Sequence, residues 1–192
     1  MKKRKNIITV AIDSPAAAGA GTQAKLISKY YNLFYLDTGK IYRYIGKLKL
    51  NKKNKFSYDL VKNKIKVLNL NYLKDKSLLS NKVAQSASKI AKDKKIRNIV
   101  HKFQQECAYN PPMKYDGSVL DGRDIITVQM KDAMFKFYIS ASINVRAKRR
   151  FEEYKKFNLD ISYKEMLKSL TKRDKLDKGR KYRSLKKQKI LS

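Results

Sequence analysis

Short apolar runs alternate along the chain with longer amphipathic stretches, and this pattern predicts strands that alternate with helices. Residues 6–12 (NIITVAI) are apolar and β-branched, as is typical of a buried strand. Residues 33–36, 117–125 and 133–142 contain further apolar runs, and we expect three more strands there. Strands separated by helices favour an α/β fold, in which a parallel sheet carries helices on both faces.

The stretches between the predicted strands place apolar residues at helical spacing. One helix is expected from about Gly19, and a second after a turn at residues 37–39. Residues 81–110 form a long amphipathic helical segment that ends before two prolines. Residues 51–80 are rich in Lys and Asn with weak periodicity, and we interpret them as a variable insert of helical pieces.

Two further helices are expected towards the C-terminal end, over residues 143–156 and 162–179. The chain has 192 residues, no internal repeat and no linker rich in Pro, Gly or Ser. Such a length suits a single domain that buries a sizeable core.

Basic residues outnumber acidic ones by 47 to 16, and the net charge is +31. A polyanionic partner such as nucleic acid would explain this excess. Most of the basic residues are Lys spread along nearly the whole chain, however, which favours a bias in composition over a dedicated binding face. Only ten are Arg. Where Lys is this abundant, an Arg indicates that a planar donor with two prongs is required.

The single cysteine, Cys107, excludes an internal disulfide and fits a reducing compartment. No apolar run approaches the roughly 18 residues that a membrane span requires. The basic N-terminus has the outline of a secretory signal, but its apolar stretch is too short and contains Asp13. We therefore expect a cytoplasmic monomer without a membrane partner.

The stretch AIDSPAAAGAGT, residues 11–22, follows the first predicted strand and opens the first predicted helix. Small residues there let successive backbone N–H groups close around a phosphate at the helix N-terminus. The phosphate-loop pattern G-x-x-x-x-G-K-[ST] is only partly met. Ser14 replaces its first glycine, Ala20 replaces its lysine, and Thr22 stands one place late. A small-residue turn without any ligand is the alternative.

Further motifs follow this loop along the chain: LDTGKIYR, VAQSASKIAKDKKIR, VLDGRDIITV, FYISASINVRAKRR and LTKRDKLDKGR. Together with the loop, they resemble the bacterial cytidylate kinase family from residue 7 to about 185. The resemblance implies a parallel sheet like that of P-loop nucleoside monophosphate kinases, with a monophosphate-binding insert at about 45–110 and a lid at about 146–180. It also implies transfer of the γ-phosphoryl group of ATP to CMP or dCMP, with Mg²⁺.

The resemblance assigns the loop to the phosphates of ATP, through Ser14, Pro15, Ala16, Ala17, Ala18, Gly19, Ala20, Gly21 and Thr22. On the acceptor side, the Thr38 hydroxyl can bond a ribose or base edge, or it can instead cap the next helix. Arg43, on that helix, can bind a phosphate with two parallel N–H bonds. Arg123 and Asp124 flank a strand end, where open α/β sheets bind ligands. The resemblance places five more residues around CMP: Ser88 at the cytosine edge, Arg97 at the base or its neighbouring phosphate, Arg173 at a phosphate, and Asp177 and Arg180 at the sugar.

Four arginines are predicted to act on the transferring phosphates: Arg123, Arg146, Arg149 and Arg150. The last three lie on one helical face and form part of the predicted lid, where they can meet the charge that develops during transfer. Asp121 is predicted to hold Mg²⁺ through water, and a turn-stabilising role is its alternative. A solvated basic helix is the alternative for any single arginine. Against it, eight of the ten arginines stand at motif positions of the family: Arg43, Arg97, Arg123, Arg146, Arg149, Arg150, Arg173 and Arg180.

Ala20 is the main departure from the family pattern. Loss of one preorganised phosphate donor commonly costs about 10²–10³ in rate, and a lid arginine such as Arg149 is the best candidate to replace it. The resemblance would also continue past Leu185 into a final strand and helix, of which only KKQKILS remains, so we expect both to be missing. Two alternatives to an active kinase stay open: a nucleotide-binding pseudokinase of the same family, and a basic nucleic-acid-binding protein.

Overall fold

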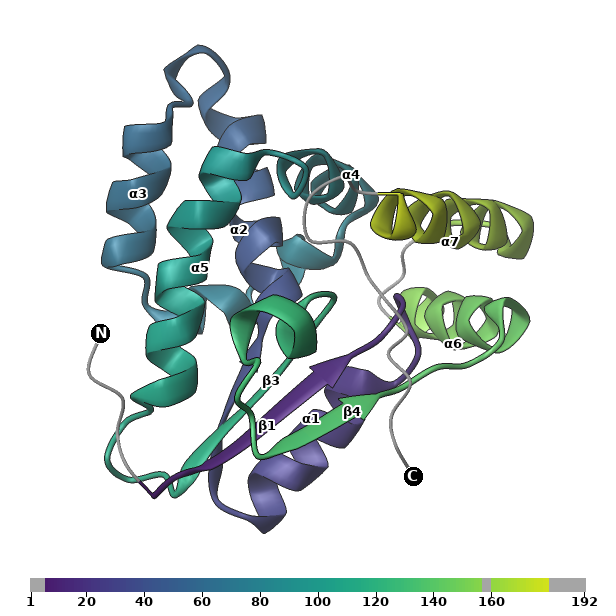
Figure 1. Cartoon of the computed structure of the whole chain (residues 1–192). Coiled ribbons are helices and arrows are strands. Elements are labelled where there is room, and N and C mark those ends of the chain that lie inside the picture. The colour runs from purple at the N-terminus through teal and green to yellow at the C-terminus, as the bar shows by residue number, and fades with distance from the viewer. Residues whose placement is uncertain (1–5, 157–159, 180–192) are drawn as a thin grey trace.

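The computed structural model describes residues 6–156 and 160–179. Within these ranges a parallel sheet of four strands has the order β2-β3-β1-β4 (Figure 1). The strands are β1 (Ile8–Asp13), β2 (Leu33–Asp37), β3 (Gly117–Gly122) and β4 (Phe135–Tyr138). The predicted α/β class and all four strands are therefore confirmed. The last strand is shorter than the apolar run that predicted it.

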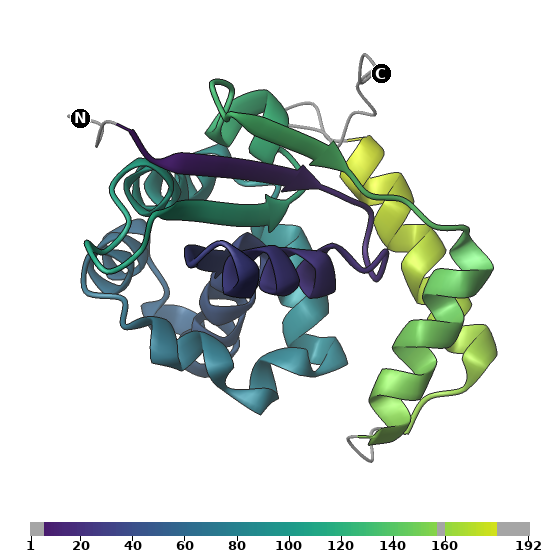
Figure 2. The same cartoon turned by 90° about the horizontal axis from the view of Figure 1, so that it is seen from below.

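Helix α1 (Ala20–Tyr30) lies along one face of the sheet, as the view from below shows (Figure 2). Alternate strand residues point to that face, since successive side chains of a strand lie on opposite sides. Ala20 and Ala24 of α1 pack there in a small apolar cluster with Val10, Ile12, Leu33 and Val119. Small side chains at the start of α1 bring the preceding loop close to the sheet.

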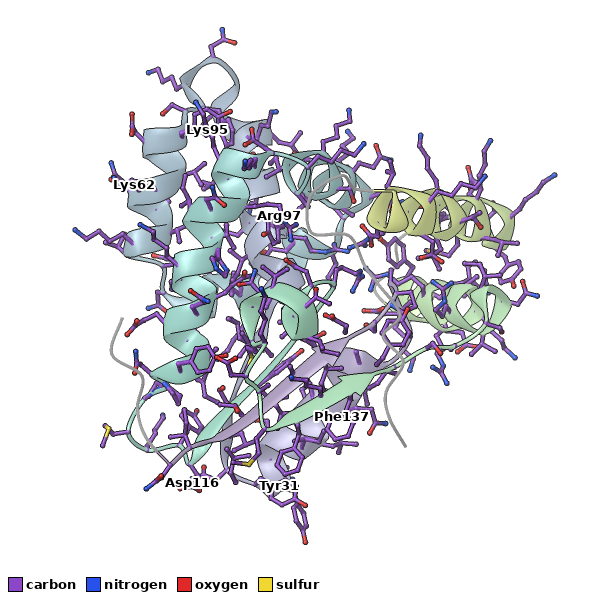
Figure 3. All side chains as sticks on the ribbon, in the orientation of Figure 1. Tyr31, Lys62, Lys95, Arg97, Asp116 and Phe137 are labelled. Carbon is purple, nitrogen blue, oxygen red and sulfur yellow. The ribbon has the colours of Figure 1, made fainter. Side chains whose placement is uncertain are left out.

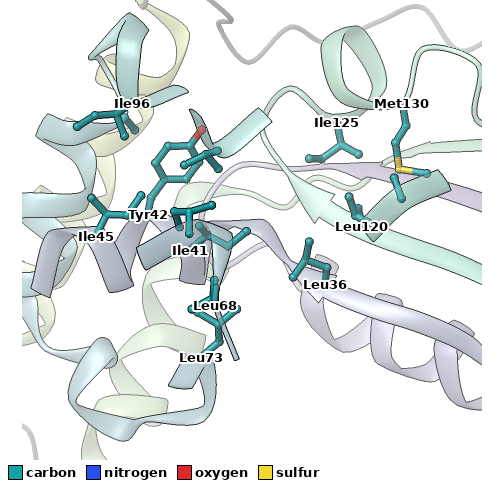
Figure 4. Packing of buried hydrophobic residues seen from close by; sticks show 14 of the residues in the cluster. Leu36, Ile41, Tyr42, Ile45, Leu68, Leu73, Ile96, Leu120, Ile125 and Met130 are labelled. Carbon is teal, nitrogen blue, oxygen red and sulfur yellow. The ribbon is translucent and has the colours of Figure 1, made fainter. Parts of the chain in front are cut away.

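The opposite face carries the remaining central helices: α2 (Thr38–Lys52), α3 (Tyr58–Lys66), α4 (Asn81–Ile90) and α5 (Lys94–Tyr109). Lys62 and Lys95 project outward from α3 and α5 (Figure 3). Inside, Leu36 and Leu120 from the sheet join Ile41 and Ile45 of α2 and Ile96 of α5 in the main core (Figure 4). Helices therefore cover both faces of the sheet, as predicted.

Two local predictions differ from the structure. Strand β2 passes directly into α2 at Thr38, without the separate turn expected at residues 37–39. The segment 81–110 is split into α4 and α5, because Asp93 caps a new helix by accepting hydrogen bonds from the Lys95 and Ile96 amides. Residues 51–80 form helical pieces as expected: α3 and three 3₁₀ turns.

Helices α6 (Ile143–Lys156) and α7 (Tyr163–Lys178) pack side by side beyond the carboxyl ends of β1 and β4 (Figures 1 and 2). Ser162 and Glu165 form a capping box that starts α7. A third apolar cluster joins the two helices to the loop after β1, through Ala16, Ala147, Tyr154, Met166 and Leu170. This contact fixes the helix pair against the loop.

Within the described ranges, no helix is both long and apolar enough to span a membrane. The prediction about a missing final strand and helix concerns residues beyond 185, which lie outside the described ranges.

Candidate functional site

A cavity of about 680 Å³ opens at the carboxyl ends of β1, β2 and β3, between the loop after β1 and the helices. This size is typical of a small-molecule site. Most of the predicted site residues line it: the whole loop from Ser14 to Thr22, and Thr38, Arg43, Ser88, Arg97, Asp121, Arg123, Asp124, Arg149, Arg150, Arg173 and Asp177. Residues up to 163 positions apart in sequence are thus brought to one place.

The loop after β1 has the form of an anion cradle. The Ser14 amide donates to the Gly122 carbonyl, which ties the loop to β3. Gly19 has φ 98°, and the amides of Thr22 and Gln23 both donate to its carbonyl oxygen as α1 begins. Backbone N–H groups at a helix N-terminus attract anions. The loop can therefore bind phosphate through its backbone, whatever side chain stands at position 20.

Arg146 does not belong to the cavity lining of the described residues. Its guanidinium donates to both carboxylate oxygens of Asp174, at 3.1 and 2.6 Å, and to the carbonyls of Ala16 and Ala141. Those bonds link α6, α7 and the loop. The structure thus separates Arg146 from Arg149 and Arg150, with which it was grouped, and its catalytic role stays a prediction. Arg180 lies outside the described residues.

Thr38 holds the turn after β3 in place. Its hydroxyl donates to the Asp121 carbonyl at 2.7 Å, and the side chain is buried. A Cβ at Gly122 would stand only 2.4 Å from the Thr38 Oγ1 and 2.8 Å from the Ile125 side chain. Glycine is therefore required at 122, and the Thr38 oxygen keeps lone pairs that can still accept a bond from a ligand.

Arg97 and Asp124, both predicted to bind CMP, form an ion pair. The distance from Arg97 Nη2 to Asp124 Oδ2 is 2.6 Å, and the two side chains are 1% and 8% exposed. Arg97 also donates to the Ala91 carbonyl and lies over the Tyr42 ring. Figure 3 shows Arg97 inside the molecule, in contrast to the outward lysines of α3 and α5. The pair joins α5 to the turn after β3 at the edge of the cavity.

Positive charge is concentrated on one part of the cavity lining, the wall formed by Arg43, Arg123, Arg150 and Arg173. Burial, together with the charges of Arg123, Arg43 and Arg150, lowers the pKa of the Arg173 guanidinium to about 9, although Asp177 opposes the shift. Burial and Arg150 likewise lower the pKa of Arg43 to about 10. Asp177 offsets part of this charge, because Arg123 Nε donates to its Oδ2 at 2.9 Å. A bound phosphate would relieve the mutual repulsion of these four arginines.

Comparison with known proteins places the chain among known enzymes. A sequence model described as "Cytidylate kinase" matches residues 10–190. The chain belongs to the cytidylate kinase family. A protein named cytidylate kinase from Clostridium botulinum strain Hall is 37% identical over 194 residues, which cover 95% of this chain and 87% of the relative. One from Bartonella tribocorum is 42% identical over 180 residues, with 92% and 81% covered, and one from Bartonella quintana is 42% identical over 175 residues, with 88% and 77% covered.

Sequence reasoning missed one carboxylate that lines the cavity of this cytidylate kinase and two more that hold neighbouring elements in place. Asp37 lines the cavity at the end of β2, and Asp174 binds Arg146. Asp13 ends β1, is 1% exposed, and accepts hydrogen bonds from the amides of Ile125 and Ile126. Asp13 and Asp37 could have been identified from the sequence, because both stand at the ends of predicted strands and ligands bind there in such sheets.

Replacing Ala17 with glycine is expected to stabilise the protein. It adopts φ 62°, in the left-handed region that L side chains rarely occupy. This conformation costs a non-glycine residue about 1–2 kcal/mol. Glycine avoids that cost, but it loses more conformational entropy on folding, which offsets part of the gain. We expect Ala17→Gly to raise the free energy of unfolding by about 0.5–1 kcal/mol in urea titrations. Ala16→Gly is the control, because Ala16 has no positive φ and should lose stability instead. Equal effects of the two changes would contradict this account of the loop.

The buried carboxyl of Asp13 is expected to make the stability of the protein depend on pH. Burial raises its pKa to about 6, although the hydrogen bonds from Ile125 and Ile126 oppose the shift. A carboxyl whose folded pKa is raised contributes stability below its unfolded pKa of about 4, and this is lost as pH rises through the folded value. We expect this group to lower the free energy of unfolding by about 2–3 kcal/mol between pH 4 and pH 7.

The variant Asp13→Asn isolates that component. Asn cannot ionise, and its amide oxygen can still accept the bond from the Ile125 amide. Urea titrations at several pH values should show a flatter decline for the variant than for the native protein between pH 4 and pH 7. Parallel curves would contradict the buried, protonatable state of Asp13.

Proposed function

We propose that this cytidylate kinase transfers the γ-phosphoryl group of ATP to CMP or dCMP, giving CDP or dCDP. The observation that carries the proposal is the meeting of two anion sites in one cavity: the loop of residues 14–22 and the wall that contains Arg43, Arg123, Arg150 and Arg173. Phosphoryl transfer depends mainly on positioning and charge stabilisation, and two opposed phosphate sites supply both.

The two sites differ in what they offer a nucleotide. The loop binds through backbone amides at the start of α1 and suits the chain of phosphates in ATP. The opposite wall combines arginines with Ser88, Arg97, Asp124 and Asp177, so it can bind a monophosphate and the polar edges of its base and sugar. We assign ATP to the first and CMP to the second. The predicted sugar contact of Arg180 stays a prediction.

Helices α6 and α7 bring Arg149, Arg150 and Arg173 to the cavity from beyond the strand ends. This position fits the lid predicted for residues 146–180. A lid that carries guanidinium groups can exclude water and stabilise charge on the transferring group.

The carboxylates near the loop fit Mg²⁺. Asp121 lines the cavity, accepts a hydrogen bond from the Tyr35 hydroxyl through Oδ1, and has Oδ2 3.8 Å from where a Gly21 Cβ would lie. Burial and the neighbouring Asp37 charge raise the pKa of Asp121, so a cation would stabilise its ionised form. Mg²⁺ typically uses one or two carboxylates, waters and substrate phosphates. When bound, it would neutralise charge on the β- and γ-phosphates.

The test is the formation of ADP from ATP in a coupled assay, with CMP, dCMP or UMP as acceptor and Mg²⁺ present. We expect ADP formation that depends on CMP or dCMP. Binding of both nucleotides without transfer would contradict the proposal and support the pseudokinase alternative. A monomeric state and a cytoplasmic location remain predictions from the sequence.

A further inference from the structure

The loop lacks a cation where the phosphate-loop pattern has lysine. Ala20 is 3% exposed and packs against the sheet with Val10 and Ile12, at the first position of α1. A methyl group there leaves the backbone cradle intact but contributes no charge to bound phosphates. Any compensating cation must reach the loop from another element.

Arg149 of α6 lies directly against this loop. Its Nη1 donates to the Ala18 carbonyl at 3.3 Å, and the same atom lies 3.5 Å from where a Cβ on Gly19 would stand. These two residues immediately precede position 20. The apolar cluster of Ala16, Ala147, Tyr154, Met166 and Leu170 holds α6 at this distance from the loop.

The charge of Arg149 is also less engaged than that of its neighbours. Within the described residues, Arg146 is paired with Asp174, Arg150 with Glu153 and Arg123 with Asp177, whereas Arg149 has only its bond to a carbonyl. An exposed guanidinium with unused N–H donors can bind phosphate oxygens in pairs.

Two lysines, Lys25 and Lys40, also line the cavity. Lys25 stands five residues after position 20 on α1, which is a rise of about 7.5 Å along the helix. Lys40 lies near the start of α2, which follows β2, and β3 separates β2 from β1 in the sheet. Among the described residues, Arg149 is the cavity-lining cation that hydrogen-bonds to the backbone of this loop.

We infer that Arg149 supplies the positive charge that Ala20 lacks, by binding the β- and γ-phosphates of ATP from α6. The inference rests on the proposed function. It places the phosphate-binding charge on the helix pair and not on the loop. Arg149 and a lysine at position 20 would then perform the same role, which is to bind the phosphates of ATP.

A double-mutant cycle tests this exchange. Arg149→Ala, Ala20→Lys and the combined variant are compared with the native protein by kcat, KM for ATP and the Kd of Mg·ATP from calorimetry. Lys148→Ala is the matched control, because Lys148 is the exposed neighbour of Arg149 on α6 and does not line the cavity. Thermal unfolding of each variant verifies that it is folded.

We expect Arg149→Ala to lower kcat/KM for ATP by about 10² in the native background, and by less than about tenfold when position 20 is lysine. Lys148→Ala should change it less than twofold. Equal losses from Arg149→Ala in both backgrounds would overturn the inference. It would also be overturned if Lys25→Ala or Lys40→Ala, and not Arg149→Ala, lost less activity when position 20 is lysine.

The binding measurement separates this inference from the function on which it rests. If the native protein shows no transfer to CMP, the proposed function fails, but the Kd of Mg·ATP still reports on Arg149. We expect that Kd to rise about tenfold in Arg149→Ala and less than twofold in Lys148→Ala. Unchanged ATP affinity in Arg149→Ala would overturn the inference. Arg149→Lys, which keeps the charge but not the planar fork, should recover part of the loss, and this keeps the test valid if Ala20→Lys does not fold.

Discussion

Replacing Asp124 with alanine is expected to lower the free energy of unfolding by about 3–5 kcal/mol, because Arg97 would lose its carboxylate while remaining buried. The Arg97 side chain is only 1% exposed and its Nη2 lies 2.6 Å from Asp124 Oδ2. Urea titration at neutral pH measures the change. Arg97→Met in the Asp124→Ala background should recover part of the loss, because it removes a buried charge that the Asp124 carboxylate no longer balances.

The exposed pair Lys47–Asp75 is the control for this prediction. Its side chains are 34% and 42% exposed, although the two atoms are also 2.6 Å apart. Solvent screens such pairs, so Lys47→Ala should cost no more than about 1 kcal/mol. If Asp124→Ala cost no more than Lys47→Ala, the Arg97–Asp124 pair would not be a main link between α5 and the turn after β3.

Arg123→Ala is expected to reduce kcat/KM for CMP phosphorylation by about 10²–10³, the effect of removing one preorganised donor from a developing charge. Burial alone would lower the pKa of Arg123, but Asp177, Asp121 and Asp13 raise it, so the group stays charged in the cavity. Its Nε–H is directed to Asp177 of α7, which aligns the guanidinium between the sheet and the helix pair. Steady-state kinetics with CMP varied at saturating Mg·ATP measure the loss.

Two variants show whether this loss is specific. Arg123→Lys keeps the charge but not the fork that binds Asp177 and a phosphate together, so we expect it to recover only part of the activity. Lys131→Ala removes one exposed charge shortly after the same turn and should leave kcat/KM within about twofold. Similar losses in Arg123→Ala and Lys131→Ala would indicate that general charge, and not this guanidinium, matters.

Local patterns predicted the strands because each is a short apolar run that ends at a polar or small residue. Residues 6–12 correspond to β1 and residues 33–36 to β2, each with a shift of one or two residues. The break at Asp93 was missed, since the amphipathic pattern continues through it and the cap becomes apparent only in the bonds to the Lys95 and Ile96 amides. Periodicity shows which face is buried and does not show where a helix is interrupted.

The scarcity of arginine made most residues of the site predictable from the sequence. The different partner that each arginine contacts was not predictable. Arg146 and Arg149 are three residues apart and looked equivalent, yet Arg146 is paired with Asp174 of α7 and Arg149 lies against the loop. Likewise, the bond from the Ile125 amide to Asp13 spans 112 residues. Such partners depend on how distant elements pack, and no local pattern in one sequence specifies them.

The transfer of a phosphoryl group between two nucleotides held in one cavity is the central claim, and labelled ATP tests it most directly. The protein is incubated with CMP, Mg²⁺ and ATP that carries ³²P at the γ position, and the products are separated. The account predicts label in CDP, in amounts that depend on CMP. Label found only in inorganic phosphate, or remaining entirely in ATP, would contradict it.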